Sequence, residues 1–187
     1  MSKLTSIACR ISKKQIAWLL AALLVSTALV AQDTDQPSQE IINKRIEEIF
    51  KIALDRGTGT TVEGYSYNLG KVFPSVAEYA EIKKYGDRAI AHLAAFLGKN
   101  DDRAQLLAVL FLTEIGGSHV RKILSPVAEK SSSAFIRYKA LRALEQYPWP
   151  DIAEVVRRMS MNDDSPGVKS RARELVEKND KRESKQH

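Results

Sequence analysis

The chain has 187 residues, of which 44% are hydrophobic and 28% charged, with one cysteine and a formal net charge of +6. This length and composition predict one globular domain with a hydrophobic core. Four of the 29 basic residues precede residue 31, in a segment without Asp or Glu, which leaves 25 basic against 23 acidic residues, or +2. So small an excess does not provide the clustered basic surface that nucleic-acid phosphates require, and no nucleic-acid partner is expected.

Residues 1–31 show the three parts of a signal peptide: a basic start, an apolar run over 16–30 and small residues at its end. The run of about 15 residues is shorter than the roughly 20 that span a bilayer, which favours a cleaved signal over a retained anchor. Cleavage after Ala28 or Ala31 would give a periplasmic or secreted protein without a stable membrane span. Because Cys9 lies in this segment, the mature chain would contain neither a disulfide nor a thiolate metal site.

The next part of the chain is predicted to form an N-terminal helical cap over 40–85. Residues 32–39 are polar, contain Pro37 and predict a linker. From about Ser38 the apolar residues follow the three-and-four spacing of an amphipathic helix, which Gly57 is placed to end.

The remainder of the cap is a loop and a short helix. Residues 57–74 are rich in Gly, Thr and Tyr and predict a long loop. Ser75 and Glu78 form a capping-box pattern, which predicts a helix over 76–84 that stops at Gly86.

From Asp87 onward the apolar residues repeat every 32 residues. A period in the thirties with two amphipathic helices in each unit is typical of an α-solenoid, in which each unit buries its apolar face against its neighbours. The first helices of the three pairs are predicted over 87–98, 119–129 and 150–160, and the second helices over 102–115, 134–147 and 167–178. Residues 179–187 predict a polar, frayed tail. The repeated positions are Ala104, Ala108, Phe111 and Leu112; Ile136, Ala140, Ala143 and Leu144; and Val168, Ala172, Leu175 and Val176.

The second helices resemble HEAT repeats. Ile136-Arg137 followed by Ala140 and Leu144 has the HEAT order of a β-branched residue, a basic residue, a small residue and a leucine, and Val168-Lys169 begins the same order. The run over 86–90 resembles the opening helix of the short HEAT-like units of bacterial proteins, including those of phycobilisome lyases. The resemblance covers 86–178.

The resemblance implies an all-α fold: a short α-solenoid of three HEAT-like helix pairs with an N-terminal helical cap. HEAT-like solenoids serve as scaffolds, inhibitors, chaperones and occasionally enzymes, so the fold does not specify an activity. The resemblance also implies a ladder of acidic and basic side chains between repeats, which this chain shows as Asp163 before Lys169. Gln105 stands where the other copies have Arg137 and Lys169.

We find no catalytic constellation in the sequence, and no cofactor is expected. The three histidines are His92, His119 and His187, and none has metal-ligand spacing to another histidine or to a cysteine. His92 falls near core positions of a helix, where a structural histidine is expected. The chain is therefore predicted to be a non-enzymatic module that binds a protein or peptide. Two other functions stay open: an envelope enzyme or an accessory subunit of one, of the HEAT-like lyase type, and a purely structural spacer.

One helix departs from the repeated pattern. The face away from the core carries Tyr138 and Arg142 in the middle copy, but the equivalent places in the first copy are Leu106 and Leu110, so helix 102–115 is apolar nearly all round. Either the chain covers these leucines, through the first helix or the aromatic loop over 57–74, or they form a docking site for a partner.

The candidate binding surface is the groove lined by the second helices. Its predicted residues are Leu106, Leu110, Tyr138 and Arg142, with Arg137 and Lys169 at its flank. Tyr138 and Arg142 are expected to point away from the core because of their helical spacing. For Arg137 and Lys169 a place in the ladder between repeats is an equal alternative.

Overall fold

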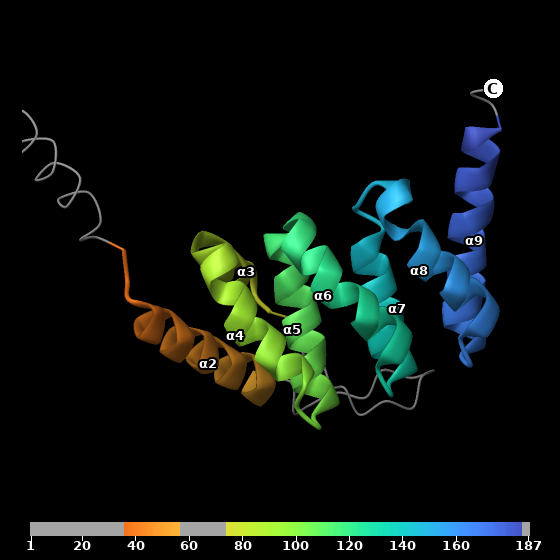
Figure 1. Cartoon of the computed structure of the whole chain (residues 1–187). Helices are drawn as coiled ribbons and strands as arrows, with labels where there is room; N and C mark the ends of the chain where they lie inside the picture. The colour runs from red at the N-terminus through yellow and green to blue at the C-terminus, as the bar shows by residue number, and fades with distance from the viewer. Residues whose placement is uncertain (1–35, 57–73, 185–187) are drawn as a thin grey trace, which may run out of the picture. The chain divides into compact units, whose positions relative to one another are not determined.

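Figure 1 shows the computed structural model of the chain, which describes residues 36–56 and 74–184. Within these ranges the regular structure is helical and contains no strand, so the predicted all-α class is confirmed. None of the helices in these ranges is long and apolar enough to cross a membrane. The predicted signal peptide and the aromatic part of the loop lie outside the described residues. The helices are α2 (Gln39–Arg56), α3 (Val76–Tyr85), α4 (Asp87–Leu97), α5 (Asp102–Ile115), α6 (Gly117–Lys130), α7 (Ala134–Leu144), α8 (Trp149–Asn162) and α9 (Pro166–Glu183).

Local side chains fix where the helices begin. The capping box predicted for α3 is present: the Glu78 backbone N–H donates to Ser75 Oγ at 3.3 Å, and the Ser75 N–H donates to Glu78 Oε2 at 2.7 Å. The Asp101 carboxylate accepts from the N–H groups of Arg103 and Ala104 and caps α5. Ser133 occupies the same place before α7 but makes no such bond.

The helices from α4 onward pack as three successive pairs in two rows. Contacts join α4 to α5, α6 to α7, and α8 to α9 within the pairs. One row consists of α4, α6 and α8, and the other of α5, α7 and α9, with each helix contacting the next in its row. Figure 1 shows these helices following one another along the molecule.

Helices α2 and α3 continue the same arrangement at the N-terminal end of the stack. Helix α2 contacts α4, and α3 contacts α5, so the two occupy the places of a preceding pair. The aromatic ring of Phe50 on α2 stacks on Phe96 of α4 at 3.9 Å and lies 5.5 Å from Phe111 of α5. The predicted cap is therefore packed as a fourth pair, whose two helices are joined by the long segment over 57–73.

A single hydrophobic core runs through all eight helices of the described ranges. The repeated positions found in the sequence are buried, apart from the half-buried Val176. The small residues Ala108, Ala140 and Ala172, which are 0% exposed, lie at the same register of α5, α7 and α9. The 32-residue period thus reports which side of each helix faces the core.

Several helix boundaries differ from the sequence predictions. Helix α6 begins at Gly117, two residues early, and α7 ends at Leu144, before the turn that contains Tyr147. Helix α9 continues to Glu183, so residues 179–183 are not a frayed tail. The Asp180 carboxylate pairs with Arg157 of α8 at 3.2 Å, and basic residues in the last turn of α9 suit the negative end of the helix dipole.

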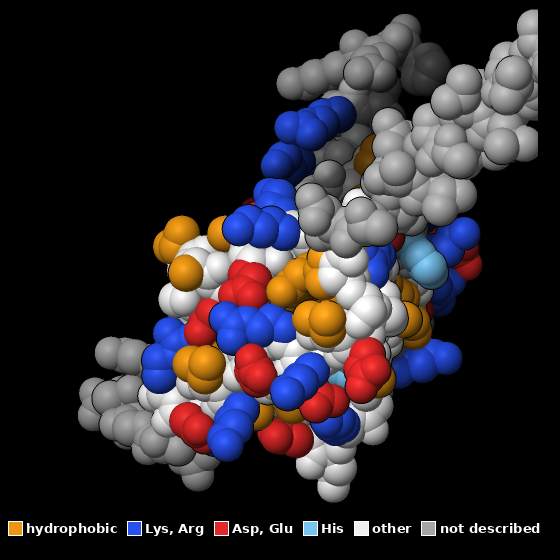
Figure 2. Space-filling view, turned by 90° about the vertical axis from the view of Figure 1, so that its left-hand side faces the viewer, with side chains coloured by type: hydrophobic (Ala, Val, Ile, Leu, Met, Phe, Trp, Pro, Cys, Tyr) orange, Lys and Arg blue, Asp and Glu red, His pale blue; other side chains and the backbone are white. Residues whose placement is uncertain are grey.

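The side of the molecule on which α2 lies has a mixed surface. Figure 2 shows acidic, basic and hydrophobic side chains interspersed there. Helix α2 supplies four acidic and four basic residues to this mixture, together with the partly exposed Ile41 and Ile52. Such alternation of both signs is typical of a solvated helix face.

Candidate functional site

A hollow lies between α7 and α9. Its volume is about 510 Å³, and it is open to solvent. We call it the α7–α9 hollow. The residues that line it are Ala134, Phe135 and Tyr138 from α7, and Ser165, Gly167, Val168, Ser170, Arg171 and Glu174 from the start of α9 and the turn before it.

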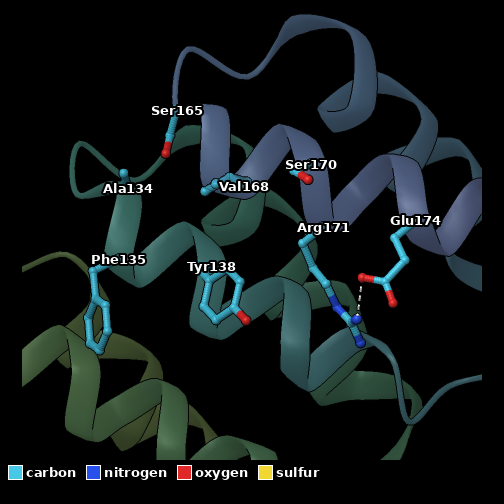
Figure 3. A pocket seen from close by; sticks show the side chains of 9 residues that line it. Ala134, Phe135, Tyr138, Ser165, Val168, Ser170, Arg171 and Glu174 are labelled. Atoms are coloured by element: carbon cyan, nitrogen blue, oxygen red, sulfur yellow. Dashed lines mark hydrogen bonds and ion pairs between the residues drawn. The ribbon is translucent and has the colours of Figure 1, made fainter. Parts of the chain in front are cut away.

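Aromatic and small side chains give the α7–α9 hollow its shape. Figure 3 shows the Tyr138 ring projecting from α7 into the space that faces α9, with Arg171 and Glu174 across from it. Ser170 stands at the position of α9 equivalent to Tyr138, and Gly167 adds no side chain at all. Because α9 carries these small residues where α7 carries large ones, the two helices leave space between them.

Ion pairs form the polar wall of the α7–α9 hollow. Arg171 donates to Glu145 through Nε at 2.8 Å and Nη2 at 2.5 Å, and to Glu174 through Nη1 at 2.7 Å. The hydrogen bonds to Glu145 above all, and those to Glu174, raise the pKa of the Arg171 guanidinium, so it remains charged. The wall is thus a set of mutually neutralised charges beside an apolar floor.

Two of the predicted residues lie at this hollow or next to it. Tyr138 lines it, although its ring is half-buried against the core and not wholly turned to solvent as the helical spacing predicted. Arg142 lies one turn further along α7, with half of its side chain exposed, and its Nη1 is 3.7 Å from Glu145 Oε2. It therefore belongs to the same charge network as Arg171.

Arg137 is placed elsewhere, within the ladder between pairs. Its residue is 6% exposed, and its guanidinium donates to both carboxylate oxygens of Asp163, at 2.9 and 3.0 Å, and to Asp164. It also donates to the carbonyl of Ser131 at 2.8 Å. Of the two alternatives for this residue, the structure shows the ladder contact. The acid of that ladder, Asp163, meets Arg137 and not Lys169, which is half-buried on α9.

Leu106 and Leu110 occupy the equivalent face of α5. Leu106 is 2% exposed but does not belong to the core cluster that the other buried hydrophobic side chains of the described ranges form. Leu110 is half-buried. Helix α2 does pack on α5, through Phe50 on Phe111 and through Arg103, which donates to the carbonyl of Leu54. The aromatic loop, the other cover considered for these leucines, lies outside the described residues.

Sequence reasoning missed several residues of the α7–α9 hollow. Phe135, Arg171 and Glu174 line it, yet none was predicted as a site residue. The signal was available for Phe135, which precedes Tyr138 by three residues and so shares its helix face. Arg171 gave no signal, because its role depends on Glu145, which is 26 residues away in the chain.

Two of the three histidines, His92 and His119, lie in the described residues. His92 lies edge-on to Phe96 at 5.6 Å, and its Nε2 is 3.4 Å from Glu47 Oε1. His119 is exposed at the start of α6. Within residues 36–56 and 74–184, no group of three or more His, Cys, Asp or Glu side chains could hold a metal ion.

Comparison of the chain with protein-family models, with curated proteins and with solved structures finds no match.

Proposed function

We propose that this protein is a non-enzymatic binding module that holds a segment of a protein or peptide in the α7–α9 hollow. The observation that carries the proposal is the hollow itself: about 510 Å³ between two helices, with an aromatic floor and a wall of paired charges. Ligand sites in proteins have volumes in the range of about 300–1,000 Å³ and are lined mainly by apolar side chains with a few fixed polar groups.

The chemistry of the lining favours a large apolar side chain as the part of the partner that enters. Phe135, Tyr138 and Val168 offer apolar contact, and the Tyr138 hydroxyl and Ser170 offer hydrogen bonds at the edge. The carboxylates and the guanidinium of the wall already satisfy one another, so an incoming apolar group need not strip water from an unpaired charge. Tyrosine is among the residues that contribute most to binding interfaces.

The architecture supports this proposal through its repetition. We propose that the stacked helix pairs form a short HEAT-like solenoid in which α5, α7 and α9 line the binding side. The support is the 32-residue register, which places Ala108, Ala140 and Ala172 at matching buried positions of these helices. Solenoids of this kind use the surface formed by one row of helices to bind extended partners.

The compartment follows from the proposed signal peptide over 1–31. If it is removed on export, the intact mass of protein from its native host should correspond to a chain that begins near Leu29 or Gln32. That chain should have no thiol to alkylate, since the sole cysteine is Cys9. A full-length chain retained in the cytoplasm would contradict the proposed periplasmic or secreted location.

Selection of peptides tests the binding function directly. A random peptide library is displayed on phage and selected on the immobilised protein, and the Kd of the enriched peptides is measured by fluorescence anisotropy. We expect enriched peptides to share a large apolar residue, and Tyr138→Ala to weaken their binding about tenfold or more. Tyr138→Phe keeps the aromatic ring and removes the hydroxyl, so its Kd shows how much of the binding depends on the hydroxyl.

The matched control is Met161→Ala, which removes an exposed hydrophobic side chain (64%) on α8, outside the hollow. It should leave the Kd unchanged. Circular dichroism checks that each variant keeps its helices. Failure to enrich any peptide, or equal effects of Tyr138→Ala and Met161→Ala, would overturn the proposal.

A further inference from the structure

Across the boundary between the α6–α7 pair and the α8–α9 pair, called here the last boundary, four arginines contact carboxylates. Arg137 on α7 meets Asp163 in the turn between α8 and α9, and Arg158 on α8 meets Glu129 on α6 at 2.6 Å. The other two are Arg171, which meets Glu145 at 2.5 Å, and Arg121. Arg121 Nε lies 3.9 Å from Asp151 Oδ2, and its Nη1 donates to the Asp151 backbone carbonyl at 2.7 Å.

These contacts differ in how deeply they are buried. The side chains of Arg137 and Asp163 are 8% and 3% exposed, whereas those of Arg171 and Glu145 are each 19% exposed. Breaking a buried pair leaves charges without solvent or a partner, which costs more than breaking a pair that water can reach. The Arg137–Asp163 contact therefore resists opening more than the others do.

The Arg171–Glu145 contact, by contrast, can open without leaving either charge unpaired. Arg171 already donates to Glu174 on its own helix at 2.7 Å, and Glu145 lies 3.7 Å from Arg142 on its own helix. Arg158 has the same kind of second partner in Glu154 on α8. Each of these charges can keep a neighbour on its own helix while it releases the neighbour across the boundary.

The α7–α9 hollow lies between the fixed contact and the exchangeable one. Its lining begins at Ala134 and Ser165, close in sequence to Arg137 and Asp163, and ends at Arg171 and Glu174. Empty space between two helices means fewer contacts to hold them at one separation. Because the core continues into α8 and α9, a movement here must be a small swing and not a separation.

We propose that α8 and α9 swing as one body about the buried Arg137–Asp163 contact, with Glu145–Arg171 as a latch whose opening widens the α7–α9 hollow. The swing exchanges contacts across the last boundary for contacts within each helix. The swing depends on the contacts of the last boundary and not on which partner the hollow binds.

Distances between spin labels test whether α8 and α9 swing at the last boundary. In a chain with Cys9→Ser, one label pair is placed at Lys122 of α6 and Lys178 of α9, across the last boundary. The control pair is placed at Ala95 of α4 and Lys122, across the preceding boundary. All of these side chains are exposed. Raising the salt concentration from about 0.1 M to about 1 M shortens the Debye length from about 10 Å to about 3 Å and weakens partly exposed ion pairs.

We expect high salt to shift or broaden the Lys122–Lys178 distance distribution by about 1–2 Å or more, and to leave the Ala95–Lys122 distribution unchanged. Glu145→Gln should produce the same change at low salt, because it removes the charge of the latch. The matched variant Glu177→Gln, at an exposed carboxylate of α9, should not. The proposal would be overturned if neither high salt nor Glu145→Gln changed the Lys122–Lys178 distance distribution. Equal changes in the distributions of the two label pairs would also overturn it.

Discussion

The middle and the last boundaries of the stack differ in their polar contacts. At the middle boundary, between the α4–α5 and α6–α7 pairs, α5 and α7 meet through the buried core, and a hydrogen bond from Gln146 Nε2 to the Thr113 carbonyl at 3.4 Å joins the two pairs. At the last boundary the core is accompanied by four arginines that contact carboxylates. Apolar contact is non-directional and depends on close packing, whereas ion pairs can exchange partners.

This difference follows the change in sequence between equivalent positions of the second helices. The positions that hold Leu106 and Leu110 in α5 hold Tyr138 and Arg142 in α7, and Ser170 and Glu174 in α9. Apolar character therefore falls along the row, while side-chain size rises from α5 to α7 and falls again at α9. The same repeated arrangement of helices thus gives a close-packed middle boundary and a last boundary that is open and lined with charged side chains.

Removing the buried arginine should have the largest effect on stability. Arg137→Met leaves the carboxylate of Asp163 buried without its partner, so we expect a loss of about 3–5 kcal/mol in the free energy of unfolding, measured with urea. The double variant Arg137→Met/Asp163→Leu removes both charges and should recover most of the loss. A single variant as stable as the parent would show that Arg137 does not hold the last boundary.

The apolar face of α5 should give the next largest effect. Because Leu106 is 2% exposed, Leu106→Ser should cost about 2–5 kcal/mol, the range for truncation of buried leucines. Leu110→Ser should cost less, since Leu110 is half-buried. If Leu106 were instead a docking residue for a partner, Leu106→Ser would leave thermal unfolding unchanged and abolish binding.

A larger side chain at the middle of the stack should have a smaller but clear effect. Ala140 is 0% exposed at the matching register of α7, so Ala140→Leu should cost about 1–3 kcal/mol through overpacking. The exposed residue Ala95 provides the control, since Ala95→Leu adds the same atoms on the solvent side of α4. Equal unfolding midpoints for the two variants would place Ala140 outside the core.

Periodicity predicted the helices and their buried faces because burial repeats with it. A small residue such as Ala140 and a branched one such as Ile136 recur every 32 residues since each second helix packs into the same surroundings. The 32-residue period does not extend to helices α2 and α3, so it did not predict that they pack as a further pair. They share the packing places of a pair but not its register, and the long segment over 57–73 separates them.

The candidate site was predicted only in part, for a physical reason. Tyr138 could be placed on the outer face of its helix from spacing alone, but the α7–α9 hollow exists because α9 presents Gly167 and Ser170 opposite it. The contacts of Arg137 and Arg171 depend on carboxylates in other helices and turns. A sequence pattern along one helix carries no information on which charge lies across the boundary.

Acid should weaken the last boundary by less than the loss of Arg137 does. Burial alone would raise the pKa of the Asp163 carboxyl, but the hydrogen bonds from Arg137 and from the Ser165 backbone N–H outweigh it and hold the pKa below its usual value. A carboxyl with a lowered pKa in the folded state contributes stability above its unfolded pKa of about 3.9, and the contribution is lost as the pH falls through the folded pKa. Protonation removes the charge of Asp163, yet Arg137 keeps the carbonyl of Ser131 as an acceptor. The expected loss is therefore smaller than that of Arg137→Met.

Comparison of the parent with the Arg137→Met/Asp163→Leu variant isolates the contribution of Asp163 to the pH dependence of stability, because the other carboxylates are common to both chains. We expect the parent to lose more unfolding free energy than the variant between about pH 6 and about pH 3, with the two curves running parallel above about pH 5. The same experiment on Ala140→Leu, which leaves every charge in place, should reproduce the slope of the parent. Parallel curves for the parent and the double variant over the whole range would mean that the Asp163 contact contributes nothing to the pH dependence. The acid sensitivity of the stack would then come from other carboxyls, such as that of Glu81 at its other end, whose pKa is lowered by hydrogen bonds from Arg45.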